Sequence, residues 1–338
     1  MHDIAFDAVA FQPLTAKPRH IIAVVGESYT SGEGASLDYL RDYYRETDSD
    51  GGDEANRNAC HRSPNAWSRR ASLADQPGVS IGTRADRFDA DLDYHMVACS
   101  GAQTENLLPG DGSIQNAWGE TGHGAHKEAS QIDQGYLDEN TTLVALSIGG
   151  NDLGWSKVIQ FCAANPMGDW CGDGFLPGLL PGETLPLKQA IPQLIRTMVI
   201  PSIETDLTGI HARARNARIV LMGYPRLLSG DAWCLGGTLS VGEVDFLNQM
   251  ADVLADEMRL LTARLDDQYA IRFSDPRAAF ENKGVCGFPT EGIHAIITSK
   301  TPGEGPGSLI SQQSFHPNLI GSGIYGIVFD DTLRALGL

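Results

Sequence analysis

Five short apolar runs, each ended by a turn signal, constrain the fold of this chain more than any other feature. They cover residues 20–25, 94–98, 143–148, 218–222 and 269–273. The runs are largely continuous rather than alternating, which is typical of strands buried on both faces of a parallel sheet. Helical patterns separate them, and strands that alternate with helices favour right-handed crossovers. We therefore predict an α/β fold: a doubly wound, flavodoxin-like parallel sheet of five strands flanked by helices.

The helical patterns differ in clarity. The clearest runs from about Val244 to Asp267, with Leu and Met side chains at helical spacing. A second covers about Leu187 to Ala214 and is interrupted by two prolines, and a third covers Leu319 to Leu336. A further helix is expected to begin with Ser63 as its N-cap.

Long polar or Gly-rich insertions follow several of the predicted strands. They cover residues 35–62, 102–130, 160–186, 227–241 and 281–312. In doubly wound sheets the active groups collect at the carboxyl ends of the strands, where these insertions begin. The 338 residues contain no internal repeat and no linker between two cores. We expect an N-terminal tail over residues 1–17 and a single domain over residues 18–338.

The chain is strongly acidic, with a formal net charge of −18. Such a charge argues against nucleic-acid binding, which needs a basic surface, and against electrostatic docking on anionic lipid. The sequence contains no run of about eighteen apolar residues, the length that would span a membrane. We also expect a monomer. The first twenty residues lack the basic start, apolar stretch and small-residue cleavage site of a signal peptide.

The chain has six scattered cysteines. They are Cys60, Cys99, Cys162, Cys171, Cys234 and Cys286. No C-x-x-C pair and no histidine at zinc-finger spacing accompanies them, so we expect no metal site; His123 and His126 lie in a Gly-rich loop without an obvious partner. An even number of cysteines in a loop-rich chain fits three disulfides and an extracellular location, although many pairings are possible. The alternative is six reduced thiols in a cytosolic protein.

Four positions near strand ends carry residues suited to nucleophilic catalysis. Ser28 follows the first strand in Gly-Glu-Ser-Tyr-Thr-Ser-Gly-Glu-Gly, where the start of a helix would present main-chain N–H groups to a developing anion. Gly101 follows the second strand in Ala-Cys-Ser-Gly-Ala, and Asn151 follows the third in Gly-Gly-Asn-Asp-Leu-Gly. His316 stands in Ser-Phe-His-Pro-Asn, just before the last predicted helix. Each motif alone is more often structural, but their order and placement predict one site.

With these four motifs the chain resembles the SGNH or GDSL-type serine hydrolases, over roughly residues 18 to 338. More narrowly, the motifs look like those of the secreted actinobacterial lipase and esterase branch. The resemblance implies that Ser28 is the nucleophile and His316 its base. It also implies an oxyanion hole made by the N–H groups of Ser28 and Gly101 and the amide of Asn151. No cofactor is implied.

The resemblance further implies three disulfides between sequence neighbours. They would be Cys60–Cys99, Cys162–Cys171 and Cys234–Cys286.

Two residues depart from the family pattern. Glu27 stands where the family usually has Asp, and we expect it to make the same structural hydrogen bonds without taking part in the chemistry. Gln313 stands where many members have the Asp that orients the histidine. Some members of the branch use a Ser–His dyad instead, in which a main-chain carbonyl accepts the histidine Nδ1–H. We therefore predict a dyad in which the Gln313 carbonyl orients His316.

The expected activity is hydrolysis of carboxylic esters, of esterase, lipase or phospholipase A type, with a small-molecule or lipid ester as substrate. One alternative is deacetylation of a carbohydrate or small metabolite by the same residues. Another is a catalytically idle binding module. The apolar insertion Trp170–Leu180 could either line an acyl pocket or pack as a surface loop.

Overall fold

A computed structural model describes residues 16–36, 42–52, 56–108, 126, 128–164, 170–230, 235–236, 238–305, 307 and 309–338. Most of the predicted tail, residues 1–15, lies outside these ranges. Five strands form one sheet in the order β2-β1-β3-β4-β5, and every neighbouring pair is parallel. The strands are β1 (His20–Gly26), β2 (Leu92–Met96), β3 (Leu143–Ser147), β4 (Arg218–Met222) and β5 (Ile271–Ser274). This strand order confirms the predicted flavodoxin-like topology.

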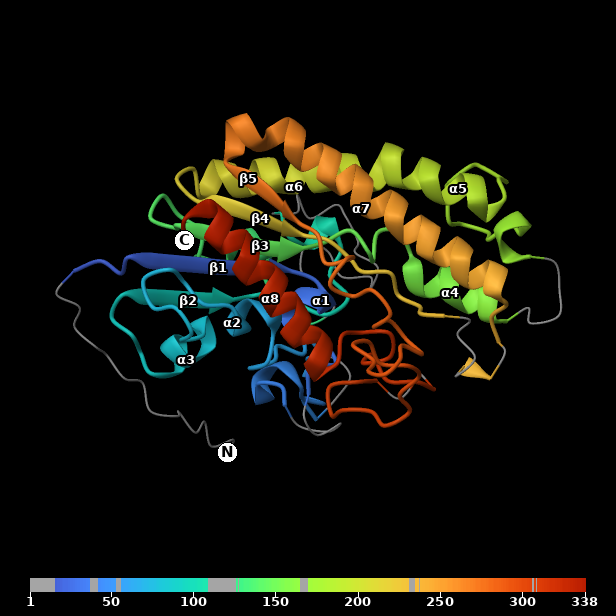
Figure 1. Cartoon of the computed structure of the whole chain (residues 1–338), viewed down its shortest axis with the longest axis horizontal. Coiled ribbons are helices and arrows are strands. Elements are labelled where there is room, and N and C mark those ends of the chain that lie inside the picture. The colour runs from blue at the N-terminus through green and yellow to red at the C-terminus, as the bar shows by residue number, and fades with distance from the viewer. Residues whose placement is uncertain are drawn as a thin grey trace.

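Helices cover both faces of the sheet. Figure 1 shows α5 (Leu187–Leu194), α6 (Ile200–Arg213) and α7 (Val241–Tyr269) along one side. On the other side α8 (Leu319–Leu336) packs against α2 (Trp67–Arg70), which contacts α3 (Ile81–Asp86). The central strands β1 and β3 are buried almost throughout, as their continuous apolar sequences predicted.

Helix boundaries differ from the sequence predictions in three places. Ser240 and Glu243 form a reciprocal capping box, so α7 begins three residues before the predicted Val244. It continues to Tyr269, and β5 starts only after Ala270 has taken a left-handed φ of 49°. The predicted N-cap Ser63 is wrong, because α2 begins at Trp67 with Ala66 as its N-cap.

The two prolines between residues 187 and 214 do not end the helical segment. Pro192 lies inside α5, and a π-helical segment, Ile195–Val199, joins α5 directly to α6. Pro201 lies in the first turn of α6, where a missing N–H is tolerated.

Disulfides tie down two of the insertions. Cys60 is bonded to Cys99 and Cys162 to Cys171, as predicted. Cys286 is also disulfide-bonded, while its predicted partner Cys234 lies outside the described residues. Within the part of the chain that the structure describes, no helix is long and apolar enough to cross a membrane.

Candidate active site

Ser28 lies at the carboxyl end of β1, on the first residue of the short helix α1 (Ser28–Ser31). The preceding Gly26 has a φ of 124°, and a side chain there would place its Cβ 2.4 Å from the Ser147 carbonyl oxygen. Only glycine can make this turn, which brings the end of β1 against β3. Glu27 caps the helix by accepting the Tyr29 main-chain N–H at 3.2 Å.

His316 approaches Ser28 from the loop before α8. Asn318 caps α8 by accepting the N–H groups of Ile320 and Gly321, which fixes the chain two residues after the histidine. The His316 Nε2 lies 2.7 Å from the Ser28 Oγ, and its Nδ1 lies 3.1 Å from the Ser314 carbonyl oxygen. A carbonyl can only accept, so Nδ1 carries the proton and the lone pair of the neutral ring faces Ser28.

The orienting carbonyl is therefore not the predicted one. The Gln313 carbonyl instead accepts the main-chain N–H of His316 at 3.1 Å. Phe315 takes a left-handed φ of 64°, and this turn directs the Ser314 carbonyl toward the imidazole. The Gln312 main chain also hydrogen-bonds the ring. Both partners are neutral, as in the predicted dyad, but they belong to the residues on either side of Gln313.

The electrostatic environment of His316 is mixed. Burial lowers the pKa of the imidazole below its ordinary value. The charge of Glu33 and the hydrogen bonds to the Ser314 and Gln312 carbonyls oppose this effect only in part. At neutral pH the ring is unprotonated, which is the state that a general base requires.

Glu27 contacts the nucleophile directly, which the sequence did not suggest. Its Oε2 lies 2.8 Å from the Ser28 Oγ, on an almost fully buried carboxyl group. Burial raises the pKa of Glu27 to about 7, although hydrogen bonds from Ser28, Tyr29 and Tyr224 oppose the rise. The single Ser28 proton thus has two acceptors, the Glu27 carboxylate and the His316 Nε2.

Gly101 and Asn151 face the same cavity as Ser28 and His316. The side-chain amide of Asn151 donates one hydrogen to the Ala102 carbonyl at 2.9 Å, and an amide nitrogen carries a second. Asp152 accepts both the main-chain N–H of Thr104 and its hydroxyl, at 3.2 and 2.5 Å. These bonds join the loop after β2 to the loop after β3, so the positions of Gly101 and Asn151 are coupled.

The cavity has a volume of about 440 Å³ and a mostly apolar wall. Its walls include Ser28 and His316, residues of α4 (Trp155–Ala163) and α7, and the loops beside them. Its apolar lining includes Leu153, Trp155, Ile159, Pro225, Leu227, Ala251, Leu254, Ile310 and Phe315. Such a volume and lining suit a small apolar ligand.

The insertion Trp170–Leu180 does not line this cavity. Trp170 packs edge-on against Phe246, with ring centroids 5.5 Å apart, and donates its indole N–H to the Gly242 carbonyl at 3.3 Å. Of the two roles considered for this insertion, the structure shows the packed surface loop.

Comparison with known proteins shows that this chain is similar to lipases. The chain is 22% identical over 298 residues to a lipase of Streptomyces rimosus, covering 88% of this chain and 80% of that protein. The chain is a homologue of Streptomyces lipases with an SGNH-type fold. No protein-family model matches it.

Two solved structures share the fold of this lipase homologue. They are a phospholipase A1 from Streptomyces albidoflavus and an extracellular lipase from Streptomyces rimosus. Each superposes with a TM-score of 0.58 at 21% identity, covering 92% of this chain and 98% of the other.

A second buried polar cluster lies beside the active site of this lipase homologue, and sequence reasoning missed it. His61 donates to Glu33 through Nδ1, and its Nε2 lies 3.4 Å from Asp48 and 3.0 Å from Thr301. Glu33 and His61 have no exposed surface. The two carboxylates raise the pKa of His61 to about 10, so the ring is cationic at neutral pH. Glu33, Asp48 and His61 lie within residues 33–61 but share no motif, Thr301 comes from a distant insertion, and only the position of Glu33 within the Ser28 motif was a signal.

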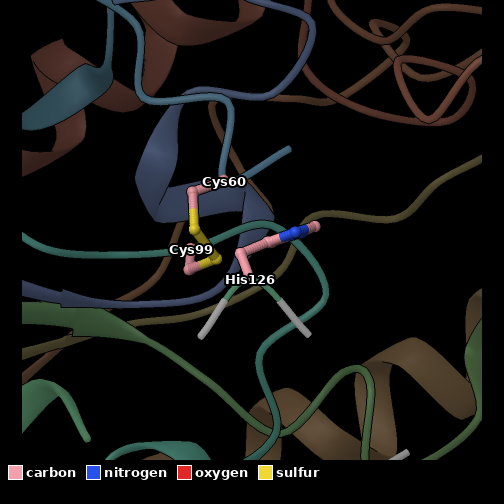
Figure 2. A group of neighbouring side chains, drawn as sticks. All are labelled: Cys60, Cys99 and His126. Atoms are coloured by element: carbon pink, nitrogen blue, oxygen red, sulfur yellow. A yellow bond between two sulfur atoms is a disulfide. The ribbon is translucent and has the colours of Figure 1, made fainter. Parts of the chain in front are cut away.

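One further group offers metal-ligand atoms in the described residues. Figure 2 shows His126 beside Cys60 and Cys99. Both sulfurs are joined in a disulfide, and the His126 Nδ1 lies 3.2 Å from the Arg57 carbonyl. Because thiolates are the ligands that zinc would use, the bonded sulfurs do not form a metal centre. His123, noted near His126 in the sequence, lies outside the described residues.

Proposed function

We propose that this lipase homologue is an extracellular carboxylic ester hydrolase that acts through an acyl-enzyme on Ser28, with His316 as general base. The observation that carries the proposal is the 2.7 Å contact between the Ser28 Oγ and the His316 Nε2 at the wall of a large apolar cavity. A hydroxyl within hydrogen-bonding reach of an oriented imidazole is the arrangement that serine nucleophiles require.

The reaction would proceed in two steps. Ser28 attacks the ester carbonyl while its proton moves to the His316 Nε2, and the imidazolium then protonates the leaving alcohol. Water, deprotonated by the same ring, releases the acid from Ser28. The Ser314 carbonyl holds the Nδ1–H throughout and keeps the ring in the required tautomer.

The negative oxygen of the tetrahedral intermediate would be held by three donors. These are the main-chain N–H groups of Ser28 and Gly101 and the second N–H of the Asn151 amide. Removal of one such donor typically costs about 100- to 1000-fold in kcat. The link between the Asn151 amide and the Ala102 carbonyl supports this role, because it fixes the donor before substrate arrives.

The cavity favours an ester with an acyl chain of several carbons over an acetyl group. Its wall is mostly apolar and includes side chains of α4 and α7, and burial of each additional methylene contributes about 0.8 kcal/mol. A deacetylase would have no use for an apolar cavity of this size. The similarity to a lipase and a phospholipase A1 agrees with this preference.

The location outside the cell is supported by the disulfides and by the extracellular lipase of Streptomyces rimosus that shares the fold. The acidic charge supports a protein without a nucleic-acid partner. We also propose that it acts as a monomer, which light scattering of the purified protein would test.

The decisive experiment is a panel of nitrophenyl esters from acetate to palmitate, hydrolysed by the wild type and by Ser28→Ala. We expect kcat/KM to rise beyond the acetate, and Ser28→Ala to lose activity on every ester. Activity confined to the acetate would favour the deacetylase. Folded wild-type protein that neither hydrolyses any ester nor reacts with a fluorophosphonate would favour the idle binding module.

A further inference from the structure

The imidazole of His316 is oriented by neutral groups in a setting that opposes its protonation. Its Nδ1 faces the Ser314 carbonyl, and burial lowers its pKa. In the proposed reaction the ring must nevertheless become an imidazolium when it takes the Ser28 proton. A negative charge close to the ring would stabilise that state.

We propose that Glu33 supplies this charge through space, as a positioning residue in place of the carboxylate that would complete a triad. The inference rests on the proposed function, since it concerns the same Ser28–His316 pair. The Glu33 carboxylate is bonded to Tyr43, His61 and Ser100 and not to the Ser28 hydroxyl or the His316 ring, while the Glu33 main-chain N–H donates to the Ser28 carbonyl at 3.0 Å.

The backbone after Glu33 packs directly against His316. If Gly34 had a side chain, its Cβ would lie 3.2 Å from the His316 Cβ and 3.0 Å from the Pro317 carbonyl oxygen. Gly34 also has a left-handed φ of 79°. This close approach holds the neighbouring Glu33, which has no exposed surface, near the imidazole.

Glu33 keeps its charge despite its complete burial. His61 donates to its Oε2, the Tyr43 hydroxyl donates to its Oε1 at 3.1 Å, and Ser100 donates to it as well. The charge and hydrogen bond of His61 outweigh desolvation and lower the pKa of Glu33 below its ordinary value. The carboxylate is therefore ionised at any pH at which the enzyme could use a neutral histidine.

The cation that stabilises Glu33 does not cancel its field, because a second carboxylate neutralises that cation. Asp48 lies 3.4 Å from the His61 Nε2 and accepts the Gly303 N–H at 2.7 Å. Two carboxylates and one imidazolium leave one negative charge on the cluster. Glu33 acts on His316, whereas Asp48 is bonded on the far side of His61.

Other groups near His316 do not supply a constant charge. Burial lowers the pKa of His294, so this ring is neutral at pH 7. The pKa of Glu27 is about 7, so this carboxyl titrates within the working range. Burial raises the pKa of Tyr29, whose ring lies 5.2 Å from that of His316, and keeps it neutral.

Glu33→Gln tests the proposal, because the amide has nearly the shape of the carboxyl group without its charge. The pKa of His316 is measured by NMR titration of its ring, assigned by the signal that His316→Ala lacks. We expect that pKa to fall by about one unit. The acidic limb of the kcat/KM profile should move to lower pH by the same amount, and kcat should fall about tenfold. A merely structural role would lower activity without moving the pKa of His316 measured by NMR or the pKa of the acidic limb of the kcat/KM profile.

Asp48→Asn is the matched control, since it removes the other carboxylate of His61. It should destabilise the cluster to a similar degree and leave the pKa of His316 within about 0.3 units. If Glu33→Gln does not fold, the double variant Glu33→Gln/His61→Gln replaces the Glu33–His61 pair by two neutral side chains and should also lower the pKa of His316.

An unchanged pKa of His316 in a folded Glu33 variant would overturn the proposal, and so would an equal fall in Asp48→Asn. The NMR titration needs no substrate. Its result therefore stands apart from the ester assay, in which the proposed function itself could fail.

Discussion

Two histidines beside the same edge of the sheet have opposite electrostatic states. His316 faces a serine hydroxyl and a main-chain carbonyl, and its pKa is lowered by burial. His61 lies between two carboxylates, which raise its pKa to about 10 although it is more deeply buried. Burial alone thus does not decide the state of an imidazole; the charge of its partners does. One ring can exchange a proton at neutral pH, and the other is a permanent cation that ties loops together.

The largest expected effect is on catalysis, and it concerns His316. His316→Ala should lower kcat for ester hydrolysis by about 10⁴- to 10⁶-fold, because the Ser28 proton loses its acceptor. Steady-state kinetics measure the loss, and circular dichroism checks the fold. His95→Ala is the control, since His95 pairs with Asp93 on β2 and does not line the cavity. Equal losses in both variants would contradict the assignment.

The next effect concerns stability. His61→Gln should lower the free energy of unfolding by about 3–5 kcal/mol at pH 7, because two carboxylates lose their buried cation. The folded pKa of about 10 exceeds the unfolded value of 6.5, so the stabilisation is complete below pH 6.5 and is lost as the pH rises through 10. The difference from the wild type in urea unfolding should therefore narrow in alkali. A constant difference would show that packing, not charge, is responsible.

Glu27 extends the comparison of the two histidines to a buried carboxyl group that has no cationic partner. Its folded pKa of about 7 lies above the ordinary 4.5, so its contribution to stability is present below pH 4.5 and is lost as the pH rises through 7. Glu27→Gln should therefore stabilise the fold by up to about 3 kcal/mol at pH 8 and by almost nothing at pH 4. Urea unfolding at the two pH values measures this, and a gain at pH 4 as large as at pH 8 would refute it.

The smallest effect is expected at Gln313. Gln313→Ala should change kcat less than about twofold, because the group that orients His316 is the main-chain carbonyl of Ser314. The buried amide should still cost about 1–2 kcal/mol of stability when it is removed. If activity disappears while the protein stays folded, the side chain of Gln313 has a role that the hydrogen bonds do not reveal.

Sequence reasoning was most successful where local chemistry determines structure. Continuous apolar runs predicted the five strands and their topology, and turn glycines after them marked the loops that bring Ser28, Gly101, Asn151 and His316 to one cavity. Such features depend on a few neighbouring residues. Two helix starts were wrong because a capping box and a late first turn override apolar periodicity.

The features that the sequence did not predict depend on backbone conformation and side-chain contacts that leave no recognisable pattern in the sequence. The choice between the carbonyls of Gln313 and Ser314 is decided by one left-handed residue, Phe315, whose conformation no sequence pattern announced. The cluster of Glu33, Asp48 and His61 lies in and just before a single insertion, but its members stand at irregular spacings and carried no common motif. The direct contact of Glu27 with Ser28 follows from one additional methylene in a side chain that was expected to be structural.

The walls of the cavity have a practical consequence. Its catalytic groups come from the sheet edge and the loops beside it, whereas part of its apolar wall comes from α4 and α7, which contribute none of them. A protein engineer could therefore set chain-length selectivity independently of turnover. Ala251 on α7 is the natural place to begin, because a larger side chain there would shorten the space for the acyl chain and leave Ser28 and His316 untouched. The same division would let natural variants diversify their substrates while keeping one catalytic apparatus.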